Sequence, residues 1–481
     1  MPVLTVRPEA PGRWGPSPAR IATLGLLLPA VAAIGVASTS PSLQRIAVAI
    51  PAGAIIVAIC LKSHKQAAMA LLAWLAVLGS LRRIVFPSAS GGSDPLLLVA
   101  PAVLGLLVVI AARKGAFRRP TRLARCVLVL SGLVVLAALN PLQGGIAVGA
   151  GGLLFVLVPP LWFWIGRGLL DDALLTRALN LVSFVAVTAA LYGLTQVYSG
   201  FPTWDQRWID TKGYTALYVG RSVRPFASFS SSSEYVGLLS VGIVIWALRL
   251  RSARLKLPVL AALALLAWAL TVASVRGALV VVPIALGMMF AASHGFGLGR
   301  TVLTGIAALF LLGVVVSQFN ASGISSELVS RQVSGLSDPF DPEKSTLPAH
   351  VDALVSGIAT GVRNPVGQGL GVVTIAGEKF GSTTISTDVD PSNVAIAMGI
   401  PGLMAYGAVV VIGLRKAFSR ARRQQDLLTL AALGIALVTL FQWLNGGNYS
   451  VAPLPWLLLG WLDNASPRSA PHVSTAPGIL A

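Results

Sequence analysis

The chain consists mainly of apolar runs that are long enough to cross a lipid bilayer. A transmembrane helix needs about 20 predominantly apolar residues, and runs near this length recur throughout the 481-residue sequence. The fourteen segments lie near residues 21–38, 44–61, 66–81, 95–112, 123–139, 145–166, 178–198, 235–248, 257–275, 278–293, 301–318, 392–414, 427–444 and 451–462. Because some are short, the sequence predicts an all-α polytopic integral membrane protein with twelve to fourteen transmembrane helices.

Composition agrees with a single membrane domain. Only 11% of the residues are charged and 55% are hydrophobic, whereas soluble proteins average about 25% charged residues. The two cysteines, Cys60 and Cys126, have neither the spacing of a metal site nor that of a disulfide framework. Pro159-Pro160 in the sixth segment predicts a kink, which neighbouring helices can tolerate in lipid.

The positions of lysine and arginine predict which loops face the cytoplasm. With the N-terminus inside and the segments alternating, the inner loops hold 24 of the 36 basic residues and five of the 17 acidic ones. The net charge of +19 then lies on the inner face, so it indicates membrane orientation and not binding to nucleic acid. Both termini are expected to be cytoplasmic, and the first segment is expected to be an uncleaved helix.

The same alternation places the two substantial loops, 199–234 and 319–391, together on the outer side. The second loop carries eight of the seventeen acidic residues. Loops beyond about 15 residues are usually functional or disordered, and we interpret this one as functional. Apolar residues recur in it at helical spacing and predict a short amphipathic helix that stops before Pro365; they are Val351, Leu354, Val355, Ile358 and Val362.

The expected organisation therefore alternates tails, helices and loops. It comprises a cytoplasmic tail (1–20), N-terminal transmembrane helices (21–198), an extracytoplasmic loop (199–234), central transmembrane helices (235–318), a large extracytoplasmic catalytic loop (319–391), C-terminal transmembrane helices (392–462) and a cytoplasmic tail (463–481).

Three arginines and one histidine stand out as candidates for chemistry. Arg221 and Arg224 precede the eighth segment, and Arg276 lies between two apolar segments that are joined too tightly for a real loop. An arginine against hydrocarbon costs about 2.5–3.5 kcal/mol on insertion scales and usually faces a cavity or a partner. The alternatives are a snorkelling anchor for Arg276, loop solvation for Arg221 and Arg224, and a helix-surface position for His350.

Several motifs occur in a fixed order around the large outer loop. They are Arg224-Pro-Phe-Ala-Ser-Phe-Ser-Ser-Ser-Ser-Glu234-Tyr235, Ser274-Val-Arg276-Gly277-Ala-Leu, Ser345 with His350 and Gly357, Asn364-Pro-Val-Gly-Gln-Gly-Leu-Gly371, Asp390-Pro-Ser-Asn393 and Gly399-Ile-Pro-Gly402. Over roughly residues 180–410 this set resembles the O-antigen ligase and polymerase superfamily. That family is similar to the GT-C-type integral membrane glycosyltransferases.

The resemblance implies an enzyme of the bacterial plasma membrane that needs no metal or other cofactor. It would transfer a glycan from a polyprenyl diphosphate carrier to the hydroxyl of a glycan or glycolipid acceptor on the outer side. Its catalytic residues would be His350, Arg224 and Arg276. The substrate-binding residues would be Arg221, Arg363, Glu234, Asp388, Asp390 and Asn393.

The chemistry of the residues agrees with that reading. Arginine forks match phosphate oxygens and do not deprotonate, and a neutral histidine can accept the acceptor proton near pH 7. The large loop ends in Asp388-Val-Asp390 where ligases carry a histidine, which favours a polymerase over a lipopolysaccharide ligase. For this acidic pair, acceptor binding, general-base help, loop structure and metal binding all stay open. A membrane transporter without glycosyl transfer is the alternative function.

Overall fold

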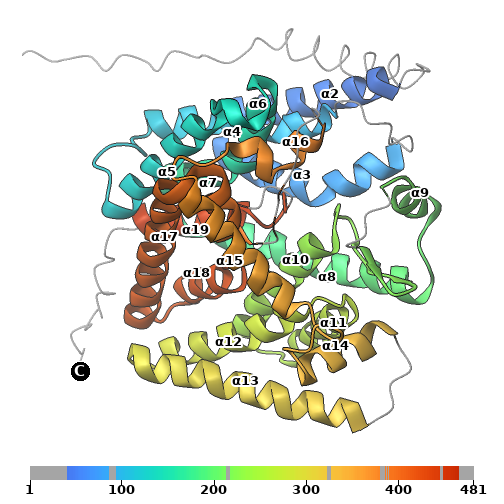
Figure 1. Cartoon of the computed structure of the whole chain (residues 1–481). Coiled ribbons are helices and arrows are strands. Elements are labelled where there is room, and N and C mark those ends of the chain that lie inside the picture. The colour runs from blue at the N-terminus through green and yellow to red at the C-terminus, as the bar shows by residue number, and fades with distance from the viewer. Residues whose placement is uncertain are drawn as a thin grey trace, which may run out of the picture.

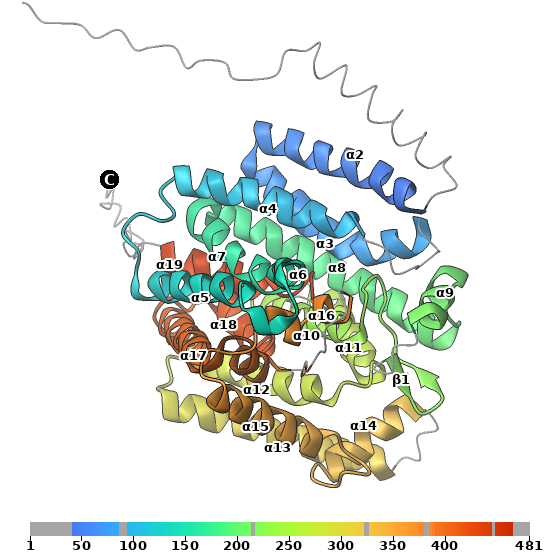
Figure 2. The ribbon, with the colours of Figure 1, turned by 45° about the horizontal axis from the view of Figure 1, so that its top comes forward.

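The computed structural model describes residues 41–85, 94–212, 217–321, 327–379, 385, 387, 389–444 and 448–464. Within these ranges the chain is almost entirely α-helical, with one short antiparallel hairpin. Helices pack around one another on all sides of α10 (Ser232–Arg249), most of whose residues are buried (Figure 1, Figure 2). The protein is therefore an all-α membrane protein in the coarse sense that the sequence predicts.

The elements follow one another along the chain with short connections. They are α2 (Pro41–Lys62), α3 (His64–Val85), α4 (Leu96–Arg113), α5 (Arg122–Ala138), η1 (Pro141–Gln143), α6 (Ile146–Val156), α7 (Val158–Leu169), α8 (Asp172–Tyr198), α9 (Thr203–Lys212), β1 (Tyr218–Val219), β2 (Ser222–Val223), α10, α11 (Leu257–Val272), α12 (Arg276–Ser293), α13 (Leu298–Ala321), α14 (Glu327–Ser337), α15 (Leu347–Arg363), η3 (Leu370–Val373), α16 (Ile375–Lys379), α17 (Asp390–Gln424), α18 (Leu427–Val438) and α19 (Pro453–Asn464).

The predicted segments coincide with helices, but the predicted number of spans is not confirmed. The segment at 21–38 lies outside the described residues, and each of the others falls on a helix. Among the residues that the structure describes, six helices are long and apolar enough to cross a membrane: α2, α3, α4, α8, α12 and α17. A seventh span forms if α6 and α7 count as one; they bend by 42° just before Pro159-Pro160, where the kink was predicted.

Side-chain caps mark where several helices begin. Thr121, Asp171, Ser231 and Asp426 each accept a hydrogen bond from a backbone N–H in the first turn of α5, α8, α10 and α18. Such caps satisfy N–H groups that have no partner inside the helix. The starts of these four helices are therefore set by local polar residues.

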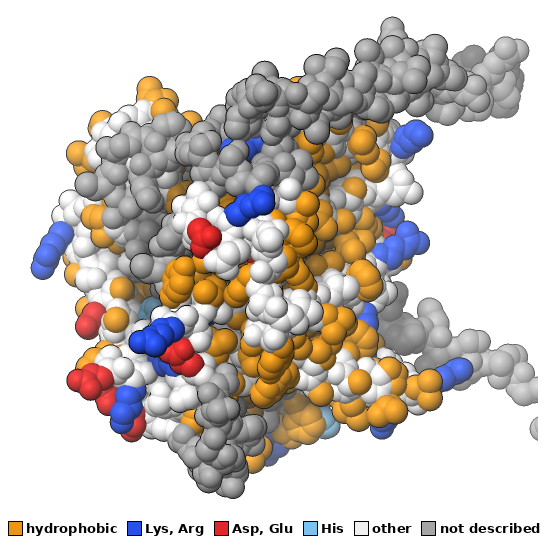
Figure 3. Space-filling view, turned by 90° about the vertical axis from the view of Figure 1, so that its right-hand side faces the viewer, with side chains coloured by type: hydrophobic (Ala, Val, Ile, Leu, Met, Phe, Trp, Pro, Cys, Tyr) orange, Lys and Arg blue, Asp and Glu red, His pale blue; other side chains and the backbone are white. Residues whose placement is uncertain are grey.

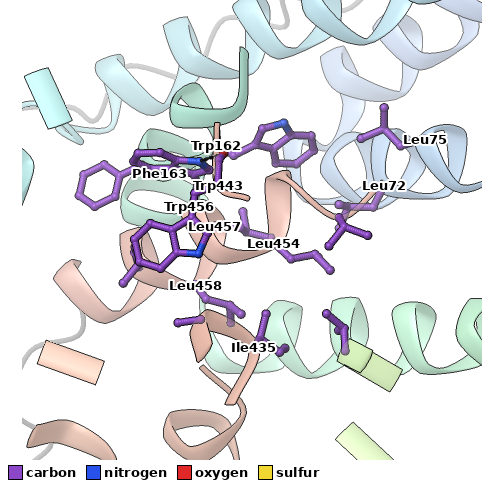
Figure 4. Close-up of a cluster of buried hydrophobic side chains, with 14 of the residues drawn as sticks. Leu72, Leu75, Trp162, Phe163, Ile435, Trp443, Leu454, Trp456, Leu457 and Leu458 are labelled. Carbon is purple, nitrogen blue, oxygen red and sulfur yellow. Dashed lines mark hydrogen bonds between the residues drawn. The ribbon is translucent and has the colours of Figure 1, made fainter. Parts of the chain in front are cut away.

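An aromatic and leucine cluster forms the centre of the core between α7, α18 and α19 (Figure 4). Trp456 donates its indole N–H to the carbonyl oxygen of Trp443 at 2.7 Å. Trp443 in turn donates to Oγ1 of Thr439 at 3.1 Å. Helices α7 and α19 touch closely because a Cβ on Gly460 would lie 2.0 Å from the carbonyl oxygen of Phe163. Both buried indoles are thus satisfied inside an otherwise apolar core.

Polar contacts at one end of the bundle join loops that were predicted to share the inner side. Asp463 of α19 is buried and accepts from Lys416 of α17 at 2.6 Å and from Thr121 before α5 at 2.7 Å. Its other ion-pair partner is Arg167 of α7, at 3.1 Å. Lys65 of α3 pairs with Asp171 before α8.

Contacts at the opposite end join loops that were predicted to share the outer side. Arg82 pairs with Asp94 at 2.5 Å, and Arg83 pairs with Asp205 at 2.6 Å. Glu234, at the start of α10, accepts from the backbone N–H of Ser450 at 2.8 Å. The contacts in these two groups therefore join loops that the sequence predicts to lie on the same side.

The surface carries many uncovered apolar side chains. Figure 3 shows hydrophobic side chains covering much of one face, with charged side chains grouped toward its edges. Among the exposed large residues are Ile146, Phe184 and Leu311 on α6, α8 and α13. Soluble monomers rarely expose large contiguous apolar patches, so this surface suits a multi-pass membrane protein.

Candidate functional site

Helix α14 lies across the end of the bundle where α11 ends and α12 begins, and it contacts two of the predicted site residues, Arg221 and Arg276. Val329 and Val333 on one face of α14 form a small apolar cluster with Val272 at the end of α11. Gln332 on the same face is buried and donates to the carbonyl oxygen of Thr271 at 3.4 Å. The amphipathic pattern of α14 therefore docks it on the ends of the membrane helices.

The side chain of Arg276 is hydrogen-bonded to α14. It is the first residue of α12, and only residues 273–275 separate it from α11. Its Nε and Nη2 both donate to the carbonyl oxygen of Arg331 in α14, at 3.2 and 2.8 Å. A Cβ on Gly335 would lie 2.1 Å from Cζ of Arg276, so the half-buried guanidinium occupies space that this glycine leaves open.

The hairpin β1–β2 meets α14 from another side. Glu327, the first residue of α14, accepts from Oγ of Ser222 at 2.7 Å and from the backbone N–H of Arg221 at 3.4 Å. The hydrogen bond from Ser222 and the nearby Arg221 and Arg331 guanidinium groups together hold the pKa of Glu327 below its ordinary value. The exposed Arg221 is thereby brought to the same helix as Arg276.

Arg224 belongs to the same hairpin. Its backbone N–H donates to the carbonyl oxygen of Leu217 at 2.7 Å, which extends the Val223–Tyr218 pairing by one position. The residue before it, Val223, packs against the cluster of Ile209, Leu217 and Phe226. The backbone of Arg224 therefore lies two residues after Ser222, the residue that contacts Glu327 of α14.

The segment that follows Arg224 is held by a buried polar network. Arg83 donates to the carbonyl oxygens of Phe229 and Ala227 at 2.5 and 2.6 Å while pairing with Asp205. Gln196 of α8 donates to Asp205 at 2.7 Å and accepts from the backbone N–H of Ala227 at 2.8 Å. This network fixes the Pro225–Phe229 segment and hence the position of Arg224.

Sequence reasoning missed Arg331, Arg83 and Asp205. Arg331 lies four residues after Glu327 on α14, the spacing that places both on one helix face, and it lies within electrostatic range of both Arg276 and Glu327. The Arg82-Arg83 pair at the end of an apolar segment was a signal for the buried network. Nothing local in the sequence identifies Asp205 as its partner.

Helix α15 confirms the amphipathic helix that the sequence predicts before Pro365. His350 and Arg363 lie near its opposite ends. Both side chains are exposed. Helix α15 packs on α17 through two glycines, since a Cβ on Gly357 would lie 1.8 Å from Oγ of Ser392 and one on Gly361 would lie 2.6 Å from the carbonyl oxygen of Ala395. His350 lies two helical turns before Gly357 and therefore on the same face of α15. This part of α15 extends past the start of α17. The N-terminal end of α15 lies beside α14 in Figure 1 and Figure 2.

The Asn364–Gly371 motif lines a kink in α17. Gly399 adopts φ 62° and ψ −155°, a conformation open essentially to glycine. The N–H groups of Gln368 and Gly369 donate to the carbonyl oxygens of Ile396 and Ala397 at 2.9 and 3.0 Å, just before that kink. The motif and Gly399 therefore form one structural unit at the kink of α17.

Three predicted substrate-binding residues make internal contacts. Glu234 is buried and accepts from Ser450 and from the backbone N–H of Ser230. Asp390 is buried and accepts from Oη of Tyr406 at 2.9 Å and from the backbone N–H of Leu444 at 2.8 Å. Asn393 exchanges hydrogen bonds with Thr387. These placements hold loops to helices and lend no support to the predicted substrate contacts.

The acidic residues that the structure describes form no metal cage. Asp388 lies outside the described residues. In the 338–343 stretch, Lys344 pairs with Asp338 at 2.7 Å and with Asp341 at 3.5 Å, and Glu343 donates its backbone N–H to Asp341. Among the described residues no three His, Cys, Asp or Glu side chains lie close enough to hold a metal ion. The 338–343 stretch is therefore a charged turn between α14 and α15.

A scan against protein-family models and a search of curated proteins find no match to this chain. The distinguishing feature of the site is a group of arginines beside one carboxylate, at the start of the apolar helix α12.

Proposed function

We propose that the protein is a metal-independent glycosyltransferase of the bacterial plasma membrane, using a glycan linked to a polyprenyl diphosphate. The observation that carries the proposal is the gathering of Arg221, Arg276 and Arg331 around α14, with Glu327 beside them. This group stands at the start of α12, a helix apolar enough to span a membrane. A lipid-borne dianionic headgroup is the ligand that such a position and charge suit best.

The reaction needs charge neutralisation more than covalent help. The acceptor hydroxyl oxygen bonds to the anomeric carbon, the bond from that carbon to the phosphate oxygen breaks, and the diphosphate leaves with the electron pair. Guanidinium groups facing the diphosphate stabilise the charge that develops on it. The hydroxyl proton passes to His350, which the start of α15 carries on an exposed surface. The acceptor is a glycan or glycolipid, and a polymerase is favoured over a lipopolysaccharide ligase.

The test is transfer by the purified protein from a lipid-diphosphate oligosaccharide, with donor binding measured in parallel. Arg224→Lys and Arg276→Lys keep the charge but lose the bidentate fork. Each is expected to slow transfer about a hundredfold, equivalent to roughly 3 kcal/mol. Arg251→Lys is the matched control because Arg251 is exposed at the other end of α10. Transfer at the wild-type rate in both site variants would remove the diphosphate assignment.

His350→Ala separates proton transfer from binding. It is expected to lower turnover while donor binding stays near that of the wild type, whereas Arg276→Ala weakens both. Because Arg276 also anchors α14, thermal unfolding of each variant is measured beside activity. Full activity in His350→Ala would assign the base elsewhere, with Asp388 and Asp390 tested next.

A further inference from the structure

An open groove runs between α5 and α17, away from the arginine group on α14. The two helices lie side by side in Figure 1 and Figure 2. The groove encloses about 810 Å³ and is lined on the α5 side by Arg122, Arg125, Cys126, Val129 and Leu133. Its α17 side is lined by Ile400, Pro401, Met404, Ala405, Ala408 and Ile412.

The walls of this groove are apolar and uncovered. Met404 is 70% exposed and Val129 is 56% exposed, although both belong to apolar helices of the bundle. From Ile400 to Ile412 the wall follows α17 for twelve residues, which is about 18 Å at 1.5 Å per residue. A groove of this length along a membrane-spanning helix matches an extended acyl chain.

Positive charge is confined to one end of the groove. Arg122 and Arg125 are the first and fourth residues of α5, at the helix end where the helix dipole adds positive potential. Both side chains are exposed. In the part of the chain that the structure describes, neither forms an ion pair with a carboxylate.

We propose that this groove binds an anionic phospholipid, with an acyl chain along α5 and α17 and the phosphate against Arg122 and Arg125. Basic pockets between membrane helices bind anionic headgroups in this way. The apolar wall alone would accept any lipid chain, and the two arginines select the headgroup that keeps a net negative charge. Arg122 lies beside Thr121, which contacts Asp463, so the site is at the opposite end of the bundle from Arg276 and does not depend on the proposed reaction.

The experiment is native mass spectrometry of the full chain, purified in detergent and exposed to an equimolar mixture of phosphatidylglycerol and phosphatidylcholine. The double variant Arg122→Gln/Arg125→Gln is compared with Arg177→Gln/Arg254→Gln, which removes the same charge from exposed positions away from the groove. We expect phosphatidylglycerol to bind about thirtyfold more weakly in the first variant, as two arginines at ~1 kcal/mol each would give. The second variant should bind like the wild type.

Filling the groove provides an independent measurement. Ala408→Trp, or Val129→Trp if the first variant unfolds, should displace phosphatidylglycerol while Arg122 and Arg125 remain. Equal retention of both lipids by the wild type would overturn the proposal. Wild-type retention of phosphatidylglycerol by the Arg122→Gln/Arg125→Gln variant would overturn it as well. So would a lipid-free dimer in which a second copy of the chain covers the groove.

Discussion

Arg83 and Asp205 form a buried ion pair, with 2.6 Å between Nε of Arg83 and Oδ1 of Asp205. They are 122 positions apart in the sequence, and the segment after Arg224 folds over them through two backbone carbonyls. Tyr192 also donates its hydroxyl to Oδ2 of Asp205, at 2.6 Å. The pair therefore fixes the segment that follows Arg224, next to the hairpin that contacts Glu327 of α14.

Replacement of Asp205 by asparagine should destabilise the protein strongly. It leaves the Arg83 charge buried without compensation, which costs about 3–5 kcal/mol in comparable pairs. The measurement is thermal unfolding in detergent. Asp338→Asn, which breaks the exposed pair with Lys344, is the control and should cost about 0–1 kcal/mol. Similar losses in the two variants would contradict a structural role for the buried pair.

Gly357→Ala should push α15 away from α17. The new methyl group would meet Oγ of Ser392 at 1.8 Å, and overpacking of this kind costs about 1–3 kcal/mol. Thermal stability is expected to fall, and with it the proposed glycosyl transfer. A Ser392→Gly change in the same chain should restore them by removing the clashing atoms.

The control for that experiment is Gly132→Ala, because nothing lies within 4 Å of a Cβ at Gly132 in α5. It should leave stability unchanged or raise it by up to about 1 kcal/mol, since alanine favours a helix more than glycine. Failure of the Ser392→Gly rescue would show that the α15–α17 contact does not decide the effect.

Protonation of Glu327 should release the hairpin from α14. The pKa of Glu327 is lowered from 4.5, chiefly by the hydrogen bond from Ser222. A lowered folded-state pKa means that the contact is fully stabilising above pH 4.5 and is lost as the pH falls through the lower folded value. Amide exchange at Arg221 and Ser222, corrected for the intrinsic rate at each pH, should show this step. Glu327→Gln should abolish it, and an unchanged step in that variant would assign it to another group.

Membrane orientation can be tested with single cysteines in a chain whose Cys60 and Cys126 are replaced by alanine. A cysteine at the exposed Glu343 should react with an impermeant thiol reagent on intact cells, and one at the exposed Ser252 should react only after lysis. The reason is the excess of arginine and lysine in the loops predicted to face the cytoplasm, one of which joins the segments 235–248 and 257–275 and contains Ser252. Labelling of the Ser252 position alone would invert the topology.

The membrane class and the helix positions were accessible from sequence because they depend on local properties. A chain in hydrocarbon must satisfy its backbone polar groups within each segment, so an apolar run of the right length already specifies a helix. The helix at 347–363 was likewise predicted from spacing. The span count was not, because α11, α18 and α19 are too short to cross on their own and only packing decides how such helices lie.

The partners of the site residues were decided by tertiary structure alone. Sequence singled out Arg276, but the carbonyl oxygen of Arg331 that it binds belongs to a helix 55 positions away. Asp390 was predicted to bind substrate, yet packing buries it against Tyr406. A periodic pattern states which face of a helix is apolar and does not state which other helix meets that face. Charged groups brought together in this way owe their environment to the packing of distant segments, and that is why the gathering of arginines on α14 appears only in the folded chain.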